Sequence, residues 1–191
     1  MVRYTQERIA RFILDGKGAP ETERALDWIR DELGIIVTES NARMVRGIAA
    51  VKVGASLEDV SKILTWKEFE SFCAALLRAK GLEVQENLTL KKPRAQIDIL
   101  ARSSAMALVV DCKHWAKDMG QSSLDGVVMA QTKRAEMLRL KMPRLEPMVV
   151  VVVSLSNEAG RYVRPGVLVP IHTLADFVSN LSSYTQDLPR F

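Results

Sequence analysis

From residue 65 onward, the spacing of apolar side chains changes repeatedly between the period of a helix and that of a strand. Apolar positions three and four residues apart predict helices, and alternating or short continuous apolar runs predict strands. The predicted elements are a helix over 65–80, strands over 82–88 and twice within 95–115, a helix over 123–140, a strand over 147–155, a short helix over 157–163, a strand over 167–171 and a helix over 173–181. This order predicts an α/β or α+β sandwich, a mixed sheet flanked by helices.

The first 63 residues show mainly helical spacing. Helices are predicted over 4–14, 21–33, 41–53 and 57–64, so residues 1–63 form a small, mostly helical unit before a domain over 64–191. Ser56 and Thr65 each open a sequence typical of a capping box at a helix start. Two roles stay open for this unit, packing or dimerisation on one hand and DNA contact on the other. Lys and Arg are sparse on the third helix, which favours packing.

Charged residues interrupt the two apolar strands within 95–115. Side chains alternate between the two faces of a strand, so Asp111 and Lys113 share one face, while the face that includes Cys112 is wholly apolar. Asp98 stands alone among apolar residues on the preceding strand. Charges interrupt a buried strand when they pair, bind a metal or take part in catalysis. Both a same-face ion pair and a functional site are therefore compatible with this pattern.

Each of the two longer helices of the domain carries one polar residue beside its apolar positions. Glu70 lies at the margin of a stripe that includes Trp66 and Leu77, where it either reaches solvent or points into a polar pocket. Its position slightly favours solvent. Gln131 lies inside an apolar row and therefore needs a hydrogen-bond partner, either a neighbouring backbone group or a functional site. The other members of that row are Leu124, Val128, Ala135 and Leu138.

The composition of the chain excludes few classes of protein. The chain has 191 residues, 48% of them hydrophobic, and a net charge of +4, which permits nucleic-acid binding without requiring it. No apolar run approaches the roughly 18 residues that a membrane-spanning helix needs. The N-terminus lacks an apolar signal region, and Cys73 and Cys112 have no metal-ligand spacing. We therefore expect a cytoplasmic protein with reduced cysteines and no zinc site.

The order of these charged positions resembles the pattern of the PD-(D/E)xK nuclease superfamily. Within it, the chain is similar to the Mrr-like, archaeal Holliday-junction-resolvase-like restriction endonucleases, over about residues 65–181. FE at 69–70 matches the family's first helix, QIDI at 96–99 its Asp strand, and VDCK at 110–113 its Glu-x-Lys strand, with Asp for the commoner Glu. Gln131 occupies the position of a family glutamine. The sequence RAQ at 94–96 replaces the Gly-x-Asp stretch of many members.

The resemblance implies a restriction-endonuclease-like fold and metal-dependent hydrolysis of DNA. Asp98, Asp111 and the backbone carbonyl of Cys112 would hold Mg²⁺, with Mn²⁺ as a substitute, and Glu70 would bind the metal directly or through water. Lys113 would orient or help to deprotonate the attacking water. No organic cofactor is implied.

Further residues would serve the substrate. Gln131 would tie its helix to the site and help to place Lys113 or the phosphate. Contacts with the DNA backbone, which give salt-dependent and largely sequence-independent binding, are expected from basic side chains near the site, each of which is alternatively a solvated surface group. These candidates are Lys91, Lys92, Arg94, His114, Lys117, Lys133 and Arg134.

Three functions therefore compete. The leading one is a Mg²⁺-dependent endodeoxyribonuclease that acts as a homodimer on duplex or branched DNA, either restriction-like or junction-resolving. The alternative is a DNA-binding protein with a nuclease fold but without useful catalytic turnover. A third is a structural protein whose acids are surface features. The ordered set of two acids and a lysine favours the first.

Overall fold

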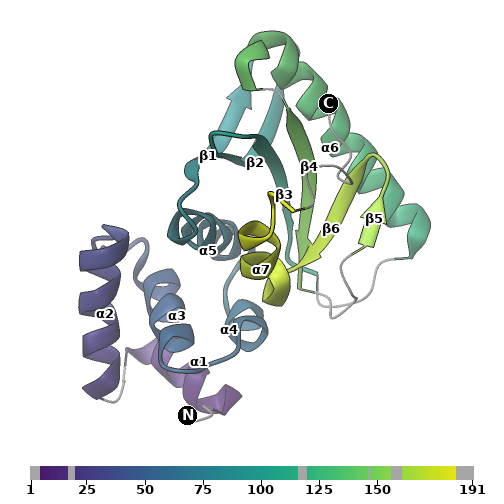
Figure 1. The fold of residues 1–191 in the computed structure, drawn as a ribbon. Coiled ribbons are helices and arrows are strands. Elements are labelled where there is room, and N and C mark those ends of the chain that lie inside the picture. The colour runs from purple at the N-terminus through teal and green to yellow at the C-terminus, as the bar shows by residue number, and fades with distance from the viewer. Residues whose placement is uncertain (1–4, 17–19, 116–119, 146, 156–160, 184–191) are drawn as a thin grey trace. The chain divides into compact units, whose positions relative to one another are not determined.

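A computed structural model gives the structure of residues 5–16, 20–115, 120–145, 147–155 and 161–183. The chain divides into two compact units, Met1–Ala75 and Leu76–Phe191, which are described separately (Figure 1). Helix α5 (Trp66–Ala79) begins in the first unit and ends in the second. The functional boundary expected after residue 63 stays a prediction. No helix in the described ranges is long and apolar enough to cross a membrane.

The first unit consists of helices, as helical spacing predicts. They are α1 (Gln6–Asp15), α2 (Pro20–Leu33), α3 (Ala42–Lys52), α4 (Leu57–Ile63) and the beginning of α5. Their ends lie within two residues of the predicted ones. The hydroxyl of Ser56 accepts the backbone N–H of Asp59 at 3.0 Å, which caps the start of α4. The side chains of Ile13, Ile29, Val45 and Val60 are fully buried in this unit.

The start of α5 is fixed by a capping box and an ion pair. Glu68 Oε2 accepts the backbone N–H of Thr65 at 2.7 Å, and the Thr65 hydroxyl accepts the N–H of Glu68 at 3.4 Å. The other carboxylate oxygen accepts Arg43 Nε at 2.7 Å, and Arg43 Nη2 also donates to the carbonyl of Ile63. Burial opposes ionisation, but the Thr65 N–H and Arg43 outweigh it and lower the pKa of Glu68 below its ordinary value. The predicted capping box is thus confirmed.

The second unit is built on a mixed six-stranded sheet with strand order β1-β2-β3-β4-β6-β5. The strands are β1 (Glu83–Leu90), β2 (Ala95–Arg102), β3 (Ala107–Lys113), β4 (Met148–Ser154), β5 (Arg161–Val163) and β6 (Gly166–Pro170). Strands β1, β2 and β3 pair antiparallel, β3, β4 and β6 pair parallel, and β5 pairs antiparallel with β6. The predicted sandwich with a mixed sheet is confirmed.

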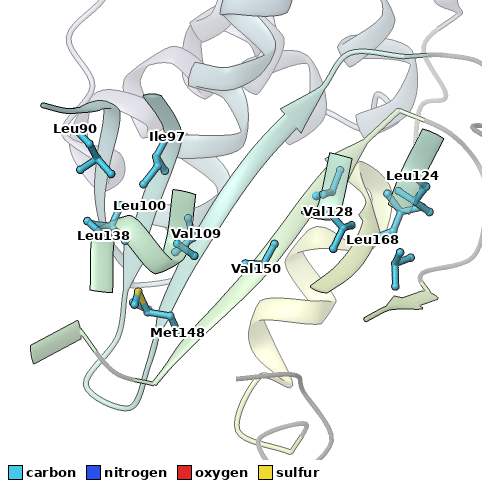
Figure 2. Close-up of a cluster of buried hydrophobic side chains, with 14 residues drawn as sticks. Leu90, Ile97, Leu100, Val109, Leu124, Val128, Leu138, Met148, Val150 and Leu168 are labelled. Atoms are coloured by element: carbon cyan, nitrogen blue, oxygen red, sulfur yellow. The ribbon is translucent and has the colours of Figure 1, made fainter. Parts of the chain in front are cut away.

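Helix α6 (Gln121–Lys141) covers one face of this sheet and forms a core with it (Figure 2). Alternate residues of the strands, such as Val109 of β3 and Val150 of β4, point toward the row of α6 that contains Leu124, Val128 and Leu138. Because β3 and β4 are buried on both faces, their sequences read as nearly continuous apolar runs. On the second face, the short helix α7 (Leu174–Ser179) packs against β6 after a 3₁₀ turn over Ile171–Thr173.

Three local expectations were wrong. Residues 161–163, expected in a short helix, form β5, because their backbone pairs with β6 at Tyr162↔Val167. Helix α6, expected to begin at residue 123, begins at Gln121 after Gly120. Trp66, expected in the buried stripe of α5, is 56% exposed, because it is the first residue of the helix.

Replacing Glu68 by Ala should lower the stability of the chain by about 1 kcal/mol at pH 7, because the cap and the Arg43 pair are both lost. A carboxylate whose pKa is lower in the folded state contributes stability above its unfolded pKa, and that contribution disappears as the pH falls through the folded pKa. The difference between wild type and Glu68→Ala should therefore shrink well below pH 4.5. Denaturant unfolding at several pH values measures it. Glu32→Gln, at an exposed site on α2, is the control; a pH-independent difference for Glu68→Ala would contradict the prediction.

Two glycines of the second unit should respond to alanine with opposite signs. A Cβ atom at Gly166 would lie 3.0 Å from Val128, from the Val150 side chain and from the Val150 carbonyl oxygen, because β6 approaches β4 and α6 closely there. Gly126 lies within α6 with open space around it. Gly166→Ala should destabilise the fold by about 1–3 kcal/mol, and Gly126→Ala should stabilise it by about 0.5–1 kcal/mol. Thermal melting compares them, and equal signs would refute this packing.

Candidate active site

Two buried polar residues face each other where the sheet meets α6. Asp111 continues the row of β3 that holds Ala107 and Val109, and it is 2% exposed. Gln131 lies in the apolar row of α6 and is fully buried. A carboxylate and an amide in such surroundings are costly unless they find polar partners. The sequence places Gln131 inside an apolar row and Asp111 on the strand face opposite the wholly apolar one, and the structure brings the two residues together through Arg134.

Arg134 links these two residues. Its Nη1 atom donates to Asp111 Oδ1 at 3.0 Å and to Gln131 Oε1 at 2.9 Å. The second carboxylate oxygen of Asp111, Oδ2, lies 2.8 Å from Lys113 Nζ, a distance typical of an ion pair, although the angle does not meet hydrogen-bond criteria. Asp111 is therefore held between two cations, which offsets the cost of burying its charge. The same-face ion pair that the sequence left open is present.

Asp98 adjoins this group from the neighbouring strand. The β2–β3 pairing begins at Ile99 and Val110, one residue after Asp98. The β1–β2 pairing leaves out Asp98 and the residue opposite it, Asn87, whose φ is +52°. In place of a ladder hydrogen bond, Asp98 Oδ2 accepts the backbone N–H of Cys112 at 2.9 Å. Within the described chain, Oδ1 of Asp98 has no hydrogen-bond partner.

The charges of these side chains act on one another. Burial is the main cause that raises the pKa of Asp98 above its ordinary value, and the negative charge of Asp111 adds to it. The Cys112 N–H, Lys113 and Arg134 oppose this rise. Asp98, Asp111, Lys113, Gln131 and Arg134, all in the second unit, therefore form one electrostatic group, which we call the Asp111 cluster.

The donors of the Asp111 cluster suit a hard cation. The N–H and C=O of one residue in an extended strand point to the same side, so the Cys112 carbonyl is expected on the side of Asp98. Two carboxylates and a carbonyl are the ligand types that Mg²⁺ prefers. Over the described residues, no three His, Cys, Asp or Glu side chains converge as a metal-binding group.

Glu70 belongs to the part of α5 that lies in the first unit. Its side chain is only 9% exposed, so the slightly favoured expectation that it reaches solvent was wrong. Phe69, Phe72 and Cys73 of the same helix are fully buried as well. A role for Glu70 in holding a metal stays a prediction.

The candidate DNA contacts have different surroundings. Lys91, Lys92, Arg94 and Lys133 are exposed, whereas His114 is half-buried. Lys117 lies outside the described residues. Arg134 differs most from the sequence-based expectation, because part of its guanidinium is committed to Asp111 and Gln131.

Sequence reasoning missed Arg134 as a member of the Asp111 cluster. The signal was its place three residues after Gln131, since residues three apart are neighbours on a helix surface. It also gave no place to Trp115, whose ring centroid lies 5.6 Å from Lys113 Nζ and whose side chain is 43% exposed. Such a ring stabilises a nearby ammonium group modestly.

One segment of the chain matches a known protein family. Residues 61–140 match the sequence model of the Mrr catalytic family, described as restriction endonuclease. An uncharacterized protein of Archaeoglobus fulgidus is 27% identical over 129 residues, which cover 63% of this chain and 95% of that protein. The structure of protein VC1899 from Vibrio cholerae aligns with 95% of this chain at 11% identity and a TM-score of 0.38, and this chain spans about half of it, 54%.

The family match and the geometry concern the same segment. It contains α5, the antiparallel strands β1 to β3 and α6 up to Leu140, and therefore every member of the Asp111 cluster. Residues 61–140 of this chain are thus similar to the Mrr-type restriction endonucleases, a family of PD-(D/E)xK nucleases.

Proposed function

We propose that this protein is a Mg²⁺-dependent endodeoxyribonuclease that hydrolyses phosphodiester bonds of duplex or branched DNA. The observation that carries the proposal is Asp111, a carboxylate 2% exposed that lies between Lys113 and Arg134 and acts electrostatically on Asp98. A purely structural ion pair needs one cation and no second acid. Two acids held close against their mutual repulsion are typical of functional sites.

Each member of the Asp111 cluster has a role in this proposal. Asp98 and Asp111 hold the cation, with the Cys112 carbonyl beside them and Glu70 directly or through water. Lys113, at 2.8 Å from Asp111 and partly exposed, orients the attacking water and helps to remove its proton. Gln131 fixes Arg134 through its Oε1 atom, and its buried Nε2 atom is a donor without a hydrogen-bond partner in the described chain.

The fit of a metal ion rests on the donors already described. Bound Mg²⁺, or Mn²⁺ in its place, supplies positive charge at the reacting phosphate and acidifies a bound water. The chain's own residues supply the position of that charge, the orientation of the water and the cations that limit repulsion between the acids.

Other parts of the proposal rest on the family resemblance. Restriction-like cutting of duplexes and resolution of four-way junctions both remain open as the reaction. Cutting both strands calls for a homodimer, and the proposed location is the cytoplasm. The competing function is a DNA-binding protein with a nuclease fold and no useful turnover, and the intact pair of acids with Lys113 argues against it.

Cleavage should depend on divalent metal and on the cluster. Wild type should nick supercoiled plasmid or cut a four-way junction with Mg²⁺ or Mn²⁺ and lose activity in EDTA. Asp111→Asn and Lys113→Met should each lower the cleavage rate by about 100-fold or more, because one removes a metal ligand and the other the group that orients water. Gel assays on both substrates measure the rates.

The matched control for these variants is Glu136→Gln, an exposed carboxylate on α6 that should leave cleavage unchanged. Melting curves establish that each variant folds, and binding to labelled duplex in EDTA separates loss of chemistry from loss of affinity. A wild type that binds DNA yet cuts neither substrate with either metal would replace the enzyme proposal by the binding-protein alternative.

Asp98→Asn should stabilise the metal-free protein at neutral pH while abolishing metal-dependent cleavage. The pKa of Asp98 is raised in the folded state above 3.8, so the folded protein binds this proton more tightly than the unfolded chain. The charged form is therefore unfavourable, and stability falls as the pH rises from 3.8 through the folded pKa. The asparagine keeps an oxygen for the Cys112 N–H.

Thermal melting in EDTA at pH 7 and near pH 3 checks this. The gain for Asp98→Asn should be present at pH 7 and smaller near pH 3, where Asp98 itself is protonated. Added Mg²⁺ should raise the melting temperature of wild type but not of the variant, because a ligand stabilises only the protein that binds it. A variant that melts lower than wild type at pH 7 in EDTA would show that the charge of Asp98 is favourable instead.

A further inference from the structure

A hollow of about 540 Å³ lies between the β1–β2 end of the sheet and α6, within the second unit. Arg94, Lys133 and Arg134 line it, together with uncharged residues that include Gln96 and Met137. No acid is among its lining residues. Three cations from two elements, far apart in the sequence, therefore surround one space. We call it the cationic hollow.

Arg134 connects this hollow to the Asp111 cluster. Only its Nη1 atom is used, in the contacts with Asp111 and Gln131. Over the described chain, Nε and Nη2 have no hydrogen-bond partner, and 34% of the side chain is exposed. One edge of the guanidinium is thus anchored by two buried residues, while its remaining donors are left for a ligand in the hollow that Arg134 lines.

We propose that the cationic hollow binds a backbone phosphate of the DNA strand, next to the phosphate that is cut, with Arg134 as its oriented donor. The inference rests on the proposed function and deepens it, because it assigns the path of the substrate. Arg94 and Lys133 add charge to the same space, and Arg134 is shared between hollow and cluster, so a strand held here is held beside Asp111.

The chemistry of the hollow favours a phosphate over other anions. A guanidinium presents several N–H donors in one plane, which match two oxygens of a phosphate, and its anchoring on Asp111 and Gln131 reduces the freedom that binding would remove. Three cations without an acid suit the charge density of a nucleic-acid backbone. The contact involves no base edge, so we expect it to act on any sequence.

This arrangement gives Arg134 two opposite effects. Its positive charge next to Asp111 disfavours a second cation there, and the same charge favours DNA in the hollow. Removing the charge should therefore strengthen metal binding and weaken DNA binding. A residue that only supports the fold would not move the two affinities in opposite directions.

Arg134→Met, Lys133→Met and, as the matched control, Arg139→Met on the same helix test the inference. Binding of a fluorescein-labelled duplex in EDTA is measured by anisotropy at several salt concentrations, and binding of Mn²⁺ without DNA by calorimetry. We expect Arg134→Met to lose about tenfold in DNA affinity, to lower the salt slope by about one, and to bind Mn²⁺ more tightly. Lys133→Met should weaken DNA binding with little change for Mn²⁺, and Arg139→Met should resemble wild type in both.

Unchanged DNA affinity and an unchanged salt slope in both Arg134→Met and Lys133→Met would overturn the inference. In that case, cleavage by wild type would still support the proposed function. The converse result, weakened binding in both variants with no cleavage by wild type, would support the hollow and refute the nuclease. Arg134→Lys keeps the charge beside Asp111; if Arg134→Met fails to fold, weaker DNA binding by Arg134→Lys and Lys133→Met supports the inference, and wild-type affinity in both refutes it.

Discussion

The burial of the Asp111 carboxylate is the constraint on which the rest of the site depends. A strand buried on both faces supplies rigidity, but a charge placed there is tolerated only with close partners. Lys113 on the same strand and Arg134 on α6 supply them. Arg134 in turn donates to Oε1 of Gln131, a polar residue in the buried row of α6. The partners of one buried charge thus link β3 to the helix that covers it.

Asp98 shows the conflict between stability and function at the same place. The ladders on both sides of β2 lack a pair at this residue, and its side chain accepts the Cys112 N–H instead. The raised pKa of Asp98 indicates that its negative charge is unfavourable in the metal-free protein. A cation between Asp98 and Asp111 would offset this unfavourable charge. The charge that destabilises the metal-free protein would therefore favour the proposed metal binding. Proteins commonly break local rules at functional sites and compensate elsewhere.

Local sequence predicted several helices and strands of the fold. It did not predict features that depend on pairing or packing with distant residues. Helical spacing and the Thr65–Glu68 capping box placed α5, and continuous valines placed β4. The strand β5 was missed because three residues have no informative period and their conformation is set by pairing with β6. Trp66 was expected to be buried, since it falls on the apolar stripe of α5. It is exposed because it is the first residue of the helix.

The sequence by itself indicated which residues are candidates for chemistry: Asp98, Asp111, Lys113 and Gln131 stand out because each is a polar side chain in an apolar pattern, and pattern is a local property. It also predicted the mixed sheet and the nuclease family. Only the tertiary structure decided that Arg134 faces Asp111, that Glu70 is buried, and that Arg94 and Lys133 share one hollow with Arg134. These relations join residues from different elements, and their distances depend on how a helix packs on a twisted sheet, which no local period encodes.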